Sequence, residues 1–166
     1  AADSYSAEPW QALAQLRLAL WLNGPDDSFE RPFVEATRAT LDRNRRSSAA
    51  HQASGDWYLR AFRATDEPRW LKEAIVGYRR AVELYPNYNL GHAQLAWALR
   101  LAGRIAESSV EAEEALRLDG LNPHREQKLA ERAVFDVSPR LDAQSPGPPD
   151  IDAEQLMRLL RSRQDS

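Results

Sequence analysis

The chain has 166 residues, of which 43% are hydrophobic and 28% charged, enough for one globular domain with a buried core. Its net charge of −3 argues against a general affinity for nucleic acid, and the lack of cysteine excludes disulfides and thiol chemistry. Sustained two-residue alternation and runs of Val, Ile or Thr are nearly absent, so the sequence predicts an all-α protein.

The first predicted element is a helix over residues 9–22, which the breaker sequence at residues 23–27 ends. Ser28 can cap a second helix, which we expect to run on into the region of residues 47–52. Residues 1–54 are therefore predicted to form an N-terminal helical hairpin, which we interpret as a degenerate first repeat with an extended second helix.

Residues 55–88 and 89–122 superpose when one stretch is slid 34 residues along the other. A fixed period of this length indicates a stacked helical-repeat protein. Apolar residues recur at spacings of three and four within both stretches, as expected for amphipathic helices. The coinciding pairs include Tyr58 with His92, Ala61 with Leu95, Leu71 with Ile105, Ala81 with Ala115 and Leu84 with Leu118.

These two units resemble tetratricopeptide repeats, and the resemblance covers 68 of the 166 residues. The matching positions are Tyr58, Ala61, Phe62, Ala74, Tyr78, Ala81 and Pro86 in the first unit and Leu95, Ala96, Leu99, Ala112, Ala115 and Leu118 in the second. The units depart from the family pattern at Phe62, His92, Ser108 and Gly120. The resemblance implies a short α-solenoid of antiparallel helix pairs, a TPR-like superhelix.

Beyond the second unit, Asn122 and Pro123 favour a new helix start, and Leu129 falls 34 residues after Leu95. We therefore predict a capping helix over residues 123–136, since the end of a stack needs a half-unit to cover its last apolar face. Four prolines mark residues 137–149 as a linker, and a last amphipathic helix is expected over residues 150–166.

The sequence offers no constellation for catalysis, so we expect no enzyme activity, cofactor or metal site in this chain. The histidines His51, His92 and His124 lack metal-ligand spacing, and no phosphate-binding or dinucleotide-binding motif is present. His92 replaces a buried aromatic of the repeat and is expected to be a partly buried packing residue. A hydrolase or transferase activity of its own is the least favoured hypothesis.

The resemblance implies that the first helix of each pair lines a concave surface that binds a protein or peptide partner. The expected binding residues are Leu59, Arg63, Asp66, Leu90, Ala93, Trp97 and Arg100. Trp97 and Arg100 are the strongest candidates, because both residue types are enriched in binding hot spots. The alternative for Trp97 is packing as core under the next helix pair. The other tryptophans are expected in the core or between helices, and the family's carboxylate clamp has no counterpart here.

Charge is unevenly distributed along the sequence. Arginines crowd the early part of the chain and glutamates a later helix, namely Arg38, Arg43, Arg45 and Arg46 against Glu107, Glu111, Glu113 and Glu114. The favoured interpretation is solvated helix faces. The alternative is a dipolar molecule that docks head to tail, as a homo-oligomer, or on an anionic surface.

Segments such as Gly55-Asp-Trp-Tyr58 and Ala81-Val-Glu-Leu-Tyr-Pro-Asn87 are similar to the soluble C-terminal repeat region of bacterial O-antigen ligase or polymerase-like membrane proteins. That resemblance implies an extracytoplasmic, periplasmic accessory module of a glycan-transfer enzyme; otherwise a cytoplasmic scaffold is expected. No stretch reaches the roughly 20 apolar residues of a membrane span, so we expect no membrane insertion. Because the chain does not begin with Met, we expect a fragment of a larger protein. Arginine outnumbers lysine 20 to 2, which we interpret as a GC-rich coding bias typical of a bacterial protein.

Overall fold

The computed structural model describes residues 8–24, 27–123 and 129. These residues form helices without any strand, which confirms the all-α prediction. The elements in chain order are α1 (Glu8–Asn23), a 3-10 turn η1 (Asp27–Phe29), α2 (Glu30–Arg43), α3 (Ser48–Thr65), α4 (Pro68–Leu84), α5 (Asn89–Leu101) and α6 (Ile105–Leu121). The expected linker 137–149 and C-terminal helix 150–166, and all but residues 123 and 129 of the expected capping helix 123–136, lie outside the described residues.

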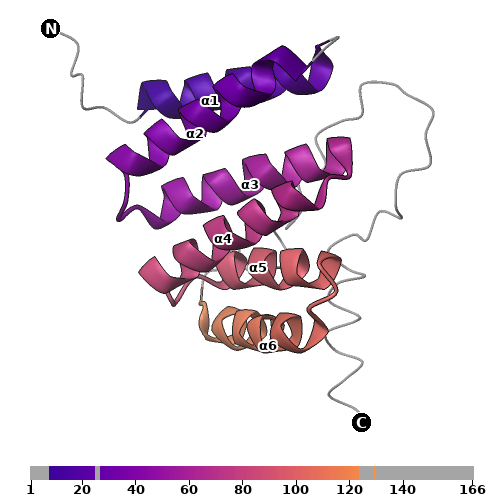
Figure 1. Ribbon diagram of the computed structural model, residues 1–166. Coiled ribbons are helices and arrows are strands. Elements are labelled where there is room, and N and C mark those ends of the chain that lie inside the picture. The colour runs from indigo at the N-terminus through magenta and orange to yellow at the C-terminus, as the bar shows by residue number, and fades with distance from the viewer. Residues whose placement is uncertain (1–7, 25–26, 124–128, 130–166) are drawn as a thin grey trace, which may run out of the picture.

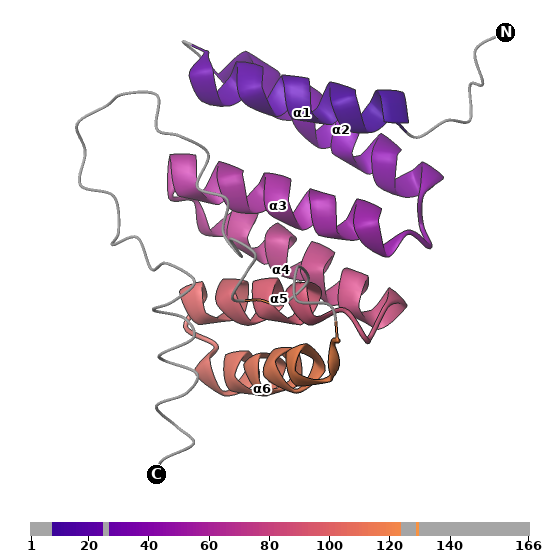
Figure 2. The same cartoon turned by 180° about the vertical axis from the view of Figure 1, so that it is seen from behind.

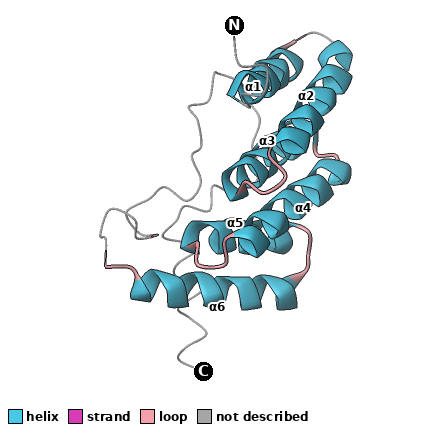
Figure 3. Ribbon diagram, turned by 90° about the vertical axis from the view of Figure 1, so that its left-hand side faces the viewer, coloured by secondary structure: helices cyan, strands magenta, loops and turns pink. Residues whose placement is uncertain are grey.

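Consecutive helices pair through short connections, and the pairs α1–α2, α3–α4 and α5–α6 follow one another along the molecule (Figures 1 and 2). Figure 3 shows the same succession from the side. Two left-handed residues end helices: Asp66, with φ 55°, follows α3, and Gly103, with φ 73°, lies between α5 and α6. Only glycine adopts such a φ routinely without strain, which explains why Gly103 stops α5 as expected.

The expected second helix running into residues 47–52 is wrong, because α2 ends at Arg43 and a new helix begins at Ser48. Ser47 is the N-cap of α3, and its hydroxyl accepts a hydrogen bond from the Ala50 N–H at 3.2 Å. Such a cap satisfies one of the free donors in a first helical turn. The expected cap Ser28 lies instead within η1, and the expected hairpin boundary at residue 54 falls inside α3.

Four aromatic rings, one from each of the first four helices, join α1–α2 to α3–α4. Trp21 lies 5.8 Å from Phe33 and 5.3 Å from Trp70, measured between ring centroids. Tyr58 stacks on Trp70 at 5.9 Å and meets Phe33 edge-on at 5.6 Å. All four side chains are buried, so this aromatic cluster is the core of the contact between the two pairs. It confirms the packing prediction for Trp21 and Trp70.

Helices α3 and α4 approach closely at two glycines. A Cβ placed on Gly77 would lie 2.9 Å from the Gly55 nitrogen, the His51 carbonyl oxygen and the Ser54 hydroxyl. A Cβ on Gly55 would lie 2.6 Å from Cδ1 of Tyr78. Glycine is therefore required at both positions for this spacing.

Burial follows the 34-residue register at most of the paired positions. Ala81 and Ala115 are both fully buried, and so are Ala61 and Leu95. Leu71 and Ile105 differ, with 5% and 44% exposure, because Ile105 is the first residue of α6 whereas Leu71 lies a full turn inside α4. The shared burial supports equivalent roles for successive helix pairs.

Leu129 covers the end of the α5–α6 pair. Its side chain is buried against Ala93, Ala115 and the half-buried Leu90, and its backbone N–H donates to Asp119 Oδ1 at 2.7 Å. Leu129 therefore occupies a buried position 34 residues after the buried Leu95, as the register predicts.

Candidate functional site

Three of the seven predicted concave-face residues are not exposed. Leu59 and Trp97 belong to the main core, where Trp97 is only 7% exposed, and Ala93 is buried against Leu129. The expectation that these three side chains are available for binding was wrong, because α3 and α5 turn them toward neighbouring elements. For Trp97, core packing is what the structure shows.

The remaining predicted residues stay at the surface in part. Arg63, Asp66 and Arg100 are exposed, and Leu90 is half-buried. Asp66 ends α3, and its backbone N–H donates to the Phe62 carbonyl at 2.7 Å. A binding role for these residues stays a prediction.

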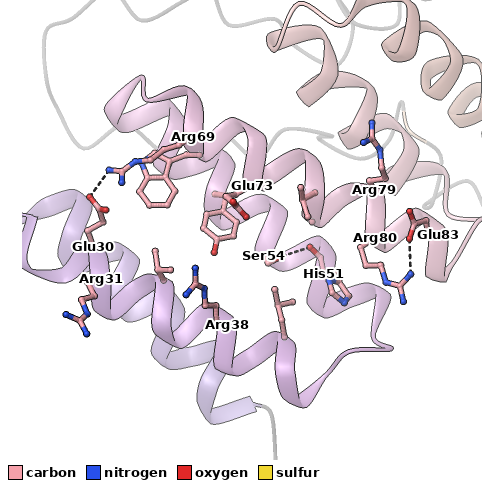
Figure 4. A pocket seen from close by; sticks show the side chains of 16 residues that line it. Glu30, Arg31, Arg38, His51, Ser54, Arg69, Glu73, Arg79, Arg80 and Glu83 are labelled. Carbon is pink, nitrogen blue, oxygen red and sulfur yellow. Dashed lines mark hydrogen bonds and ion pairs between the residues drawn. The ribbon is translucent and has the colours of Figure 1, made fainter.

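A groove of about 680 Å³ runs between α2 and α4, with α3 as its floor (Figure 4). Its walls include Val34, Arg38 and Leu41 from α2 and Glu73 and Val76 from α4. The floor is formed by His51, Ser54 and Tyr58, beside Gly77. None of the seven residues predicted for the concave face lines this groove.

The aromatic cluster and one ion pair hold the groove together at one end. Arg69 on α4 donates to Glu30 on α2 at 3.0 Å, across the groove, and also pairs with Glu67 at 2.6 Å. The Arg69 guanidinium lies 4.3 Å from the centre of the Trp70 ring, which stacks on Tyr58. The α2 and α4 walls are thus tied together through side chains.

Most charged side chains of the groove are engaged in ion pairs. Arg31 pairs with Glu35 at 2.9 Å and Arg80 with Glu83 at 2.8 Å, each within its own helix. Arg79 reaches Glu107 of α6 at 3.1 Å. These exposed pairs contribute little to stability, but in each of them a neighbouring glutamate balances the charge of the arginine.

Arg38 and Glu73 differ from the others, since neither makes an ion pair within the described part of the chain. Arg38 belongs to the α2 wall and Glu73 to the α4 wall (Figure 4). The charges of both act on the hydroxyl of Tyr58, a residue of the floor. Burial raises the pKa of Tyr58 to about 12, with the charge of Glu73 adding to the rise and that of Arg38 opposing it. The phenol is therefore neutral at physiological pH.

Apolar surface lies beside these polar groups. Val34 and Leu41 are half-buried on α2, and Val76 on α4 is 61% exposed. Trp70, which lines the groove, has a buried indole N–H without a hydrogen-bond acceptor among the described residues. Besides its ion pairs, the groove therefore combines apolar contact surface with a neutral hydroxyl and with one cation and one anion that make no ion pair among the described residues.

His92 on α5 joins α6 to the turn between α4 and α5. Its Nδ1 lies 2.7 Å from Glu111 Oε2 on α6, and its Nε2 lies 2.9 Å from the Pro86 carbonyl oxygen before α5. Burial alone lowers the pKa of His92, but the hydrogen bonds with Glu111 and Pro86 and the charges of Glu111 and Glu114 outweigh it, so the pKa is raised. Because each ring nitrogen of His92 faces a hydrogen-bond acceptor, the doubly protonated ring, which donates from both nitrogens, is favoured. The expected partly buried packing role is confirmed, with polar contacts that the sequence did not predict.

Of the two charged clusters of the sequence, the glutamates are largely paired, whereas among the described residues Arg45 is the one arginine of its cluster in an ion pair. Arg45 contacts Asp42 at 3.3 Å, and the Arg43 guanidinium lies 4.4 Å from the centre of the Trp10 ring. On α6, Glu107 pairs with Arg104 and Glu114 with Arg117, both at 2.6 Å. This pairing agrees with the interpretation of solvated helix faces, and head-to-tail docking stays a prediction.

Within the described ranges, no group of three or more His, Asp or Glu side chains is arranged to hold a metal ion. No helix there combines the length and apolarity needed to cross a bilayer. No protein-family model matches the sequence, and no curated protein matches it either. The helices and the groove therefore carry the functional argument.

The sequence carries a signal for each wall of the groove, though not for the groove itself. Val34, Arg38 and Leu41 are spaced by four and three residues, and Glu73, Val76 and Arg80 by three and four residues, so each set shares one helix face. Neither face was predicted to bind, because the family resemblance implies binding by the first helix of each pair, whereas α2 and α4 are second helices.

Proposed function

We propose that this chain is a non-catalytic, tetratricopeptide-like scaffold that binds a protein or peptide segment in the groove between α2 and α4. The observation that carries the proposal is the groove itself, a trough with two helical walls, an apolar lining and two charges that make no ion pair with any described residue. Burial that recurs at 34-residue spacing supports the repeat assignment.

A peptide fits this groove better than a reacting substrate. Its polar groups lie on helix walls, most are held in ion pairs, and the groove is an open trough rather than an enclosed pocket. A helix or extended segment lying between two helices buries apolar residues along its length, a common mode of recognition. Because helical walls are preformed, little ordering of this chain is needed on binding.

Site-specific photo-crosslinking tests the proposal in cells that express the full chain. A photoreactive amino acid is placed at Val76 in the groove, at Val110 on α6 as a matched control, and at Arg100 on the originally predicted face. Val76 and Val110 are 61% and 64% exposed, so their general accessibility is equal. We expect a discrete crosslinked partner from Val76 alone. A partner captured from Arg100 instead would indicate that the binding site lies on the first helix of each pair. Equal capture at Val76 and Val110 would refute the proposal that the partner binds in the groove.

A further inference from the structure

We infer that the groove between α2 and α4 takes an amphipathic helical segment whose apolar stripe is flanked by an acidic side chain on one side and a basic side chain on the other. This inference rests on the proposed function and names the chemistry of the partner.

The first step is the distribution of charge that remains available. Of the five arginines that line the groove, Arg31, Arg69, Arg79 and Arg80 each contact a glutamate within 3.1 Å. Arg38 alone is left on the α2 wall. Of the three lining glutamates, Glu30 and Glu83 are paired, which leaves Glu73 on the α4 wall.

The second step is the position of these two groups. Arg38 lies on the α2 wall and Glu73 on the α4 wall, and the charges of both act on the Tyr58 hydroxyl, yet no direct ion pair joins them (Figure 4). A ligand between the walls therefore meets a cation on one side and an anion on the other. It can pair with both, whereas a uniformly acidic or basic ligand would be repelled by one wall.

The third step is the apolar surface beside the charges. Val34 and Leu41 lie one turn before and after Arg38, and Val76 lies one turn after Glu73. Each wall thus presents aliphatic carbon next to its charge. An occupant that matches both walls has an apolar stripe in contact with this aliphatic carbon and opposite charges on its two flanks, which an amphipathic helix supplies.

The test uses the full chain and three synthetic peptides of the length of α2, 14 residues. All three share one leucine stripe and differ in the side chains that flank it. The mixed peptide has one acidic and one basic flank, the acidic peptide has two acidic flanks, and the basic peptide has two basic flanks. Binding of fluorescein-labelled peptide is followed by fluorescence anisotropy. Because an exposed ion pair contributes about 0.2–1 kcal/mol, we expect the wild-type chain to bind the mixed peptide about threefold more tightly than either other peptide.

Charge reversal then redirects the preference. In the Arg38→Glu variant the available charge on both walls is acidic, so the basic peptide becomes the tightest ligand. In the Glu73→Arg variant the available charge on both walls is basic, so the acidic peptide becomes the tightest ligand. Lys72→Glu and Glu113→Arg are the matched controls, since they make the same changes in net charge at exposed positions outside the groove. Both controls retain the wild-type preference for the mixed peptide. Circular dichroism verifies that every variant keeps its helices.

The inference is overturned if the order of the three peptides is the same for wild type, Arg38→Glu and Glu73→Arg, or if the controls change it as much. It is also overturned if no peptide binds. In either case a crosslinked partner at Val76 would still support the groove as a binding site, so the two proposals fail separately.

Discussion

Replacing Gly77 by alanine tests the close approach of α3 and α4. The new methyl group would lie 2.9 Å from Gly55 N, His51 O and Ser54 Oγ, and two of these are backbone atoms that cannot move aside without shifting α3. Overpacking of this kind costs about 1–3 kcal/mol, and contact with backbone places it in the upper half of that range. Alanine regains about 1 kcal/mol through its higher helix propensity. We therefore expect a net loss of about 1–2 kcal/mol.

Two other glycines provide matched controls. A Cβ at Gly120, inside α6, meets no atom within 4 Å, so Gly120→Ala should be neutral or stabilising by up to about 0.5 kcal/mol. Gly103 has equally open surroundings but a φ of 73°, so Gly103→Ala should cost about 1 kcal/mol through backbone strain alone. The three variants thus separate packing, propensity and strain.

Urea unfolding followed by far-ultraviolet circular dichroism measures these differences, with an unchanged slope verifying that only stability has shifted. In thermal unfolding, a loss of 1 kcal/mol corresponds to about 4 °C in Tm. If Gly77→Ala were as stable as Gly120→Ala, the distance between α3 and α4 in the structure would be wrong.

Three further predictions concern the polar and aromatic contacts. His92 should stabilise the fold most below its unfolded pKa of about 6.5, since its folded pKa is raised, and this contribution should disappear as pH rises through the folded value. The difference in urea midpoint between wild type and His92→Gln should therefore shrink from pH 5.5 to about 8.5; a difference that stays constant would contradict the contact with Glu111. Tyr78→Phe removes the 2.7 Å hydrogen bond that the Tyr78 hydroxyl donates to Asp56, and it should cost about 1.5–3 kcal/mol of unfolding free energy. Burial raises the pKa of this Asp56 carboxyl, whereas the hydrogen bond from Tyr78 lowers it. Thermal unfolding of Gln94→Leu, which removes a 3.0 Å bond to the same oxygen, should show a smaller loss, and a larger one would refute the assignment of Tyr78 as the main donor. Trp70→Ala should cost about 3–5 kcal/mol because it opens the aromatic cluster, whereas the half-buried Trp10 should cost clearly less; equal losses in calorimetry would argue against the cluster as the core.

Periodicity predicted the helices well because helix formation depends on local physics. The helices of residues 55–122, the stop at Gly103 and the burial of Leu129 all follow from spacing and backbone conformation, which the sequence contains directly. The start of α3 was missed because a capping serine and a helix-interior serine look alike in sequence. The close contact at Gly55 and Gly77 had a signal, since glycine inside a helical pattern often has a packing reason.

The candidate site was harder to predict, because exposure depends on neighbours that are distant in sequence. Trp97 is a plausible hot-spot residue by type, yet its surroundings place it in the core. Conversely, Arg38 and Glu73 are ordinary surface residues by type. Their interest comes from the folded arrangement: nearby arginines and glutamates form ion pairs, whereas these two form none with the residues that the structure describes.

The aromatic cluster has a consequence for how this chain can be divided. Trp21 and Phe33 from α1 and α2 close over Tyr58 and Trp70 from α3 and α4, so neither pair has a finished interior by itself. A fragment beginning at Ser48 would leave two large rings facing water and would lose cooperativity. The first four helices should therefore unfold in a single transition, and the smallest autonomous piece of the molecule spans all of them.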